Sequence, residues 1–139
     1  YKEYDEEHIT KPYIAPEGKI FAGWEIQEKY DIRFNKNNVV FIIQTLGKLS
    51  SEKKAEEIVD QIKNKSLPYN FSDVISDQIG EKSYLGKNIT IMFGQKVTIY
   101  IIAFKIRNIV VTLLGSEIPV EKILNYAEII EKNIENKVL

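Results

Sequence analysis

Residues 99–113, IYIIAFKIRNIVVTL, constrain the fold of this chain more than any other stretch. Two strongly β-forming runs are joined by residues 105–108, and almost no side chain on either run is polar. A sheet with one face in water alternates apolar and polar residues, so strands that are apolar on both faces must be covered on both. We therefore expect strands over 97–104 and 108–114 at the centre of a sheet, with other elements packed against each side.

Two segments have the spacing of amphipathic helices that can supply this cover. In residues 50–65, apolar side chains recur at i, i+3, i+4 and i+7, and Ser50 or Ser51 can cap the first turn. A second helix of about eighteen residues opens at Pro119, a residue suited to a first helical turn. The two helices cover one face each, or both cover one face while an N-terminal hairpin wraps the other.

The remaining strands are delimited by turn signals. They are expected at 19–34 and 39–46, joined by NKNN at 35–38, and at 79–87 and 88–94, separated by a turn at 86–88; residues 66–78 form a loop. Short connections of this kind make neighbouring strands antiparallel. The predicted fold class is α+β, a sandwich with an antiparallel sheet of about five to six strands at its centre, packed with two amphipathic helices.

The 139 residues suffice for one domain with one core. Residues 1–18, YKEYDEEHITKPYIAPEG, have no helical or strand period and are interpreted as an extended acidic lead-in or linker whose later part can pack on the body. Residues 19–139 then form a single α+β domain. Because the sequence starts at Tyr1 and not at methionine, we expect an upstream segment to have been removed, either a signal or membrane tether or a trimmed end.

Charge and composition exclude several classes of function. The net charge of −1 supplies no positive field for phosphate backbones, so nucleic acid is not an expected partner. The chain has no cysteine and no run of about eighteen apolar residues that could span a membrane. Asn-x-Ser/Thr triplets at Asn64, Asn70 and Asn88 favour an exported chain.

Catalytic and metal-binding sets are missing from the sequence. His8 is the single histidine and falls in the acidic lead-in beside Glu6 and Glu7, so we expect neither a serine-hydrolase triad nor a histidine-ligated zinc site. The adjacent acids Glu6-Glu7 and Glu56-Glu57 fall in the lead-in and on the polar side of a helix, and no glycine-rich phosphate loop occurs. We expect no enzymatic activity, no cofactor and no metal site.

Aromatic side chains supply the one indication of a ligand site. Trp24, Tyr69 and Tyr84 are the candidate binding residues, with Phe71 and Tyr100 able to line the same concave surface. In a chain with 11% aromatic residues, most such side chains belong to the core.

Three segments carry a family resemblance, namely DQIGEKSYLGK at 77–87, IIAFKIRNIVVTLLG at 101–115 and NYAEIIEKNIE at 125–135. Over about residues 24–137 they resemble small prokaryotic exported or lipoprotein-type domains with the Mog1/PsbP-like α/β/α sandwich. The matching positions are Ile79, Gly80, Glu81, Ser83, Tyr84, Phe104, Lys105, Asn108, Val110, Val111 and Ala127. Arg107 stands where the pattern has glycine. The resemblance implies an extracytoplasmic or surface domain without catalysis, and no functional residue carries over from it.

The function predicted is that of a noncatalytic extracytoplasmic domain that binds a protein or a small ligand, with a membrane tether upstream of Tyr1. The alternative is an intracellular Mog1-like adaptor that holds a protein partner at an exposed sheet edge or on its C-terminal helix. A large exposed apolar patch would favour partner binding. A third possibility is an enzyme that uses carboxylates or tyrosines at a strand-end cleft, which would require a pocket with two acids of strongly shifted pKa.

Overall fold

The computed structural model describes residues 2–9, 13–14, 25–26, 28–35, 39–65, 71–74 and 79–138, with side chains described within 39–64, 71–74 and 79–136. The strands are β1 (Lys2–Ile9), β2 (Tyr13–Ile14), β3 (Glu25–Ile26), β4 (Glu28–Asn35), β5 (Phe41–Lys48), β6 (Ser72–Asp73), β7 (Lys82–Met92), β8 (Gln95–Ile106) and β9 (Ile109–Ser116). The helices are α1 (Glu52–Lys65) and α2 (Val120–Val138).

One antiparallel sheet of seven strands organises the molecule, in the order β1-β4-β5-β9-β8-β7-β6. β2 and β3 pair separately. The two strands that are apolar on both faces, β8 and β9, lie inside the sheet and pair with each other from Ile99↔Ser116 to Ile106↔Ile109. The α+β class, with an antiparallel sheet and two helices, is confirmed.

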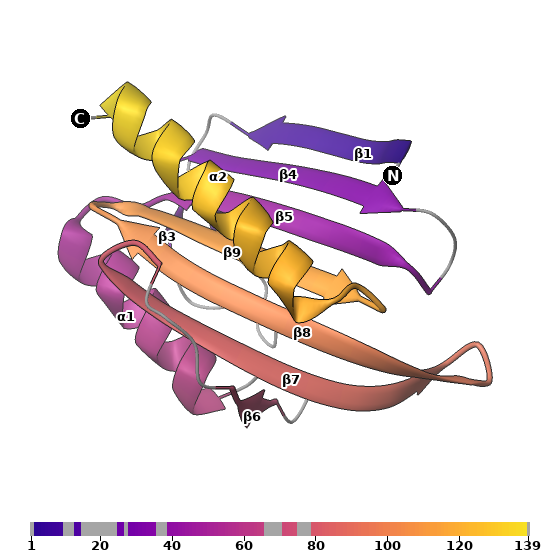
Figure 1. Ribbon diagram of the computed structural model, residues 1–139. Coiled ribbons are helices and arrows are strands. Elements are labelled where there is room, and N and C mark those ends of the chain that lie inside the picture. The colour runs from indigo at the N-terminus through magenta and orange to yellow at the C-terminus, as the bar shows by residue number, and fades with distance from the viewer. Residues whose placement is uncertain are drawn as a thin grey trace.

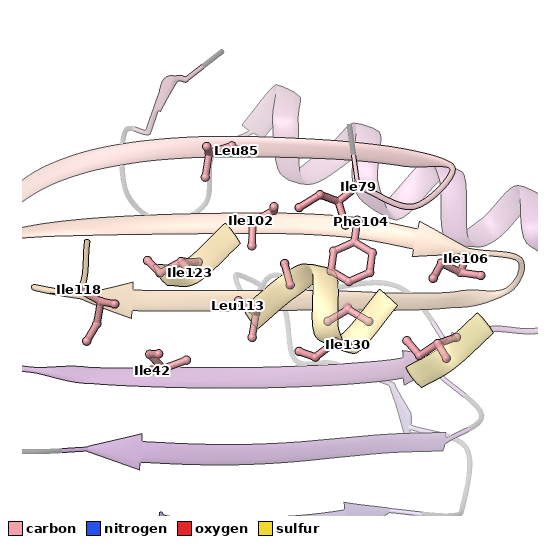
Figure 2. Packing of buried hydrophobic residues seen from close by; sticks show 13 residues of the cluster. Ile42, Ile79, Leu85, Ile102, Phe104, Ile106, Leu113, Ile118, Ile123 and Ile130 are labelled. Atoms are coloured by element: carbon pink, nitrogen blue, oxygen red, sulfur yellow. The ribbon is translucent and has the colours of Figure 1, made fainter. Parts of the chain in front are cut away.

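The two helices lie on opposite faces of the sheet (Figure 1). The α1-side cluster comprises Leu49, Ala55, Ile58, Val59, Ile62, Phe71, Tyr84, Val97, Ile99, Ile101, Ala103 and Val110. The α2-side cluster comprises Ile42, Ile79, Leu85, Ile102, Phe104, Ile106, Val111, Leu113, Ile118, Ile123, Ala127, Ile130 and Ile134 (Figure 2). β8 contributes alternate residues to both clusters, which explains why its sequence lacks a polar face.

Both helices begin where the sequence predicts. The hydroxyl oxygen of Ser51 accepts a hydrogen bond from the Lys54 N–H at 3.1 Å, which caps the open end of α1. At α2, the Pro119 carbonyl accepts hydrogen bonds from the N–H groups of Lys122 and Ile123 at 3.0 and 3.3 Å. Each helix thus presents its apolar stripe to the sheet from a defined starting point.

The turn predicted at 86–88 is wrong, because β7 runs unbroken from Lys82 to Met92. Gly86 lies inside the strand, and a Cβ atom there would come within 2.5 Å of the Tyr84 hydroxyl and 2.9 Å of the Phe71 Cβ. Gly115, one residue after the predicted strand 108–114, lies within β9, where a Cβ atom would meet Ile123 Cδ1 at 2.5 Å. Both glycines provide space for a neighbouring side chain and not a change of chain direction.

The N-terminal region adds more to the sheet than the sequence predicts. β4 and β5 pair as the expected hairpin, while residues 36–38 of its turn lie outside the described residues. Residues 2–9 of the lead-in are extended, as expected, and they pair with β4 as an edge strand. With the two-residue β6 inside the predicted 66–78 loop, this raises the strand number above five to six. Where the domain begins stays a prediction.

The connection between β8 and β9 consists of Arg107 and Asn108. Arg107 has φ of +53°, in the left-handed region that glycine adopts most easily. Arginine has a Cβ atom, so this conformation costs more backbone energy here than it would for glycine. Its N–H donates a hydrogen bond of 2.7 Å to a Glu81 carboxylate oxygen, which helps to hold this conformation.

Candidate functional site

The aromatic candidates do not form a described binding surface. Tyr84 belongs to the α1-side cluster, where it is 5% exposed and lies beside Phe71 and Gly86. Trp24 and Tyr69 lie outside the described residues, as does the His8 side chain. Tyr100 packs against the α2-side cluster, with the Lys87 Nζ 5.9 Å from its ring centroid. Ligand binding by Trp24, Tyr69 and Tyr84 stays a prediction.

The longest hairpin in the sheet, β7–β8, extends beyond its neighbours (Figure 1). Its strands pair from Lys82↔Lys105 to Met92↔Gln95, whereas β9 pairs with β8 only from Ile99 onward. Residues 89–98 therefore continue past the paired part of β9. Phe93 and Gly94 connect the strands with φ of +53° and +73°, and two positive values in a two-residue loop are the signature of a type I′ turn.

Three large apolar side chains are exposed at the end of this hairpin, and we call them the hairpin patch. They are Ile89, Ile91 and Phe93, which are 50%, 73% and 77% exposed. Together they present on the order of 300 Å² of apolar surface, a size at which exposed patches are often functional. The other exposed large hydrophobic side chain among the described residues, Ile129, lies apart on α2.

Ile89 and Ile91 lie on the same face of the sheet as α2, because they follow Leu85 of the α2-side cluster at a spacing of two. Their partners on β8 are Thr98 and Lys96. From Lys82 to Ser116 the chain contains five basic residues and no acidic one. The hairpin patch is therefore bordered by positive charge alone along these two strands.

The lysines near the hairpin patch differ from the other lysines of the two strands in their partners. Lys82 bridges to Asp60 at 2.6 Å and to Glu56 at 3.4 Å, and Lys105 bridges to Glu81 at 2.7 Å. Lys87 and Lys96 form no ion pair with any side chain that the structure describes. Their charge thus remains available to an incoming partner or repels another cation.

Among the described residues, β6 is the only strand that pairs with the outer edge of β7. β6 pairs with Lys87 and Gly86, and the Val74 N–H donates to the Leu85 carbonyl at 2.9 Å. No described strand pairs with the edge from Asn88 to Met92, which we call the β7 edge. In an antiparallel strand the main-chain N–H and C=O of alternate residues point to the same side. Since those of Leu85 point outward, those of Ile89 and Ile91 do as well.

A polar cluster connects the segment just before β7 with β8 and the 107–108 turn. Lys105 is buried, with its side chain 9% exposed, and its Nζ lies 2.7 Å from Glu81, which also accepts the Arg107 N–H. The Lys105 hydrogen bond, followed by the Arg107 hydrogen bond, lowers the pKa of Glu81 below its ordinary 4.5. The positive charge of Lys105 is paired with the Glu81 carboxylate inside the fold. We therefore interpret this cluster as structural, with the role of stabilising the turn.

The lowered pKa of Glu81 should make the free energy of unfolding depend on pH. A carboxyl group whose pKa is lowered by folding stabilises the fold above its unfolded pKa, and this contribution disappears as the pH falls through the folded pKa. The free energy of unfolding should therefore decrease below about pH 4.5, and Glu81→Gln should show a smaller decrease. Urea unfolding at a series of pH values measures both. Identical slopes for the two proteins would show that Glu81 carries no such linkage.

Comparisons with known proteins add no assignment, since the chain matches no protein-family model, no curated protein and no solved structure. In the described part of the chain, no group of three or more His, Asp or Glu side chains is arranged to hold a metal ion. None of the helices described is both long and apolar enough to cross a membrane.

Sequence reasoning did not find the hairpin patch. The segment NITIMFG at 88–94 has the composition of a buried strand, and it was predicted only as a strand ending at a turn. Its exposure depends on how far β9 and β6 extend beside it, and no local pattern contains that information. The one signal in the sequence that sets this region apart is the lack of any acidic residue between Lys82 and Ser116, which leaves the two strands with basic charges only.

Proposed function

We propose that this chain is a noncatalytic domain that binds a protein partner through the end of the β7–β8 hairpin. The observation that carries the proposal is the hairpin patch, three large apolar side chains exposed beyond the paired part of β9. Exposed apolar surface costs free energy in water, and a soluble domain keeps such a surface mainly where a partner covers it.

The β7 edge supports a particular mode of binding. Ile89 and Ile91 direct main-chain hydrogen-bonding groups outward and keep their side chains exposed on the face that carries α2. An extended segment that adds to this edge would gain ladder hydrogen bonds and apolar contacts at once, which is the usual basis of strand addition. A small-molecule function would instead require a concave site.

The proposed location is outside the cytoplasm, with a tether upstream of Tyr1. The resemblance to Mog1/PsbP-like exported domains and the three Asn-x-Ser/Thr triplets support it. The hairpin patch also supports the alternative, an intracellular adaptor of the Mog1-like kind that holds its partner at a sheet edge. The codons upstream of Tyr1 in the native gene distinguish the two, because an exported chain requires a signal there.

Site-directed photo-cross-linking tests the binding surface. A photoreactive amino acid replaces Ile91 in one variant and Ile129 in a control, because both side chains are exposed and apolar but lie on different elements. The proposal expects protein adducts from position 91 in the native host and none of the same adducts from position 129. Equal adducts from both positions would contradict it.

A further inference from the structure

We infer that the hairpin patch binds an acidic segment of another protein, in which carboxylate side chains flank an apolar one. The inference rests on the proposed function and names the chemistry of its partner. Two lysines, Lys87 and Lys96, carry it, because they lie on the same face of the sheet as the exposed isoleucines and have no acidic partner in the described part of the chain. Complementary charge therefore identifies the kind of partner that this surface fits.

The strand register places both lysines on the face that carries α2. Leu85 belongs to the α2-side cluster (Figure 2), and residues at a spacing of two along a strand share a face. Lys87 follows Leu85 by two residues, and its Nζ lies 5.9 Å from the ring centroid of Tyr100, its partner on β8. Lys96 is exposed and is the β8 partner of Ile91. Both cations thus border the two isoleucines of the hairpin patch.

The two cations stand at opposite ends of the exposed isoleucines. Lys87 precedes Ile89 by two residues, and Lys96 lies across from Ile91. Four residues of extended chain and one strand spacing separate the two lysine backbones, a distance of about 14 Å. A partner segment can therefore place one carboxylate at each lysine and an apolar side chain over the isoleucines between them. These contacts involve side chains of the sheet face and require no hydrogen bond at the β7 edge.

The charge of the two lysines is available to a partner. The other lysines of the two strands, Lys82 and Lys105, are both paired with carboxylates of this chain. The next acids along the chain after the strands are Glu117 and Glu121. The Glu117 N–H donates to the Thr98 carbonyl at 2.9 Å, which places this residue on the β9 side of β8. Negative charge therefore borders the surface toward α2, and positive charge borders it along the hairpin.

An anionic membrane fits this surface less well than an acidic protein segment. α2 packs on the same face of the sheet, and a helix with its side chains is about 10 Å thick (Figure 1). A flat surface would meet the start of this helix, with Glu121 in its first turn, before it reached Lys87. The net charge of −1 also supplies no overall attraction to anionic lipid. A narrow segment can lie along the hairpin beside the helix.

The complex should be weak and sensitive to salt. An apolar area on the order of 300 Å² is well below the roughly 800 Å² per partner of stable complexes, so the expected Kd is about 0.1–1 mM. Ion pairs between exposed side chains are screened by salt. Binding should therefore weaken as the salt concentration rises.

An NMR titration of the whole chain with a synthetic peptide tests the inference. The peptide has glutamate, isoleucine and glutamate at alternate positions, separated by serines, so that an extended chain presents all three on one side. Its counterpart has lysine in place of each glutamate. The glutamate peptide should shift the amide signals of residues 87–98, and less so as salt is added, whereas the lysine peptide should leave them unchanged.

Charge reversal at Lys96 supplies the matching variant. Lys96→Glu should weaken binding of the glutamate peptide at least about fivefold, because a repulsive charge replaces an attractive one. Lys132→Glu is the matched control, since it makes the same charge change at an exposed position of α2, toward the end of the helix away from the hairpin (Figure 1). It should bind like the unmodified chain. Amide spectra that match the unmodified chain away from each substitution show that both variants are folded.

Equal shifts from the two peptides, no shift at residues 87–98, or a Lys96→Glu variant that binds as well as the unmodified chain would each overturn the inference. So would vesicles containing phosphatidylserine that broaden the same signals more than the peptide shifts them, because the occupant would then be a membrane. These results are separate from failure of the proposed function. A chain that ignores the glutamate peptide but cross-links to a protein from position 91 retains its binding surface and loses only the acidic character of its partner.

Discussion

Replacing Phe104 by alanine should lower the free energy of unfolding by about 3–5 kcal/mol, a large part of the stability of a domain of this size. Phe104 is 0% exposed and lies in the middle of the α2-side cluster, between β8 and α2 (Figure 2). Its ring is among the largest fully buried side chains of the chain. Its loss would leave a cavity that backbone hydrogen bonds on both sides prevent from closing.

Urea unfolding measures the effect of Phe104→Ala, and Phe93→Ala is its control. The chemical change is identical, but the Phe93 side chain is 77% exposed at the tip of the hairpin. The control should change the free energy of unfolding by no more than about 0.5 kcal/mol. Similar losses for both variants would mean that the α2-side cluster does not hold the sheet and helix together as described.

Gly80→Ala should cost about 2–4 kcal/mol, because two independent effects oppose a side chain at this position. Gly80 has φ of +68°, and a Cβ atom there would lie 2.6 Å from the Lys105 main-chain oxygen. That oxygen accepts the Glu81 N–H at 2.9 Å, so it cannot move away freely. The Gly80 N–H itself donates to the Glu131 carboxylate on α2, which connects the segment before β7 to the helix.

Gly94→Ala separates the two effects. Gly94 has φ of +73°, close to that of Gly80, but no atom lies within 4 Å of the position a Cβ would take. This variant should therefore cost only the backbone strain of about 1 kcal/mol. Thermal or urea unfolding of both variants gives the comparison. If the two alanines cost the same, the close approach of Lys105 does not constrain the segment before β7.

The central elements of the fold could be predicted because each has a local signature. β8 lacks a polar face since Ile101 packs toward α1 and Ile102 toward α2, and that alone requires cover on both sides. The helices were found from their spacing of apolar residues. Gly86 was misplaced because glycine marks either a turn or a close approach, and only the positions of Tyr84 and Phe71 decide between the two.

The candidate site was harder to predict than the fold. Tyr84 attracted attention as a large aromatic residue, yet its side chain lies in the α1-side cluster. Ile91 was overlooked because isoleucine in a strand usually indicates the core. Whether it is buried depends on the lengths of β6 and β9, which are set by distant parts of the sequence.

The most direct test of the central claim, that this domain acts through the end of the β7–β8 hairpin, is mass spectrometry of the adducts formed by a photo-cross-linker at position 91. The account predicts that position 91 yields adducts with a protein partner in the native host, and that a cross-linker at position 129 does not yield the same adducts. A set of adducts that is the same from both positions, or that is absent from position 91, would contradict the claim.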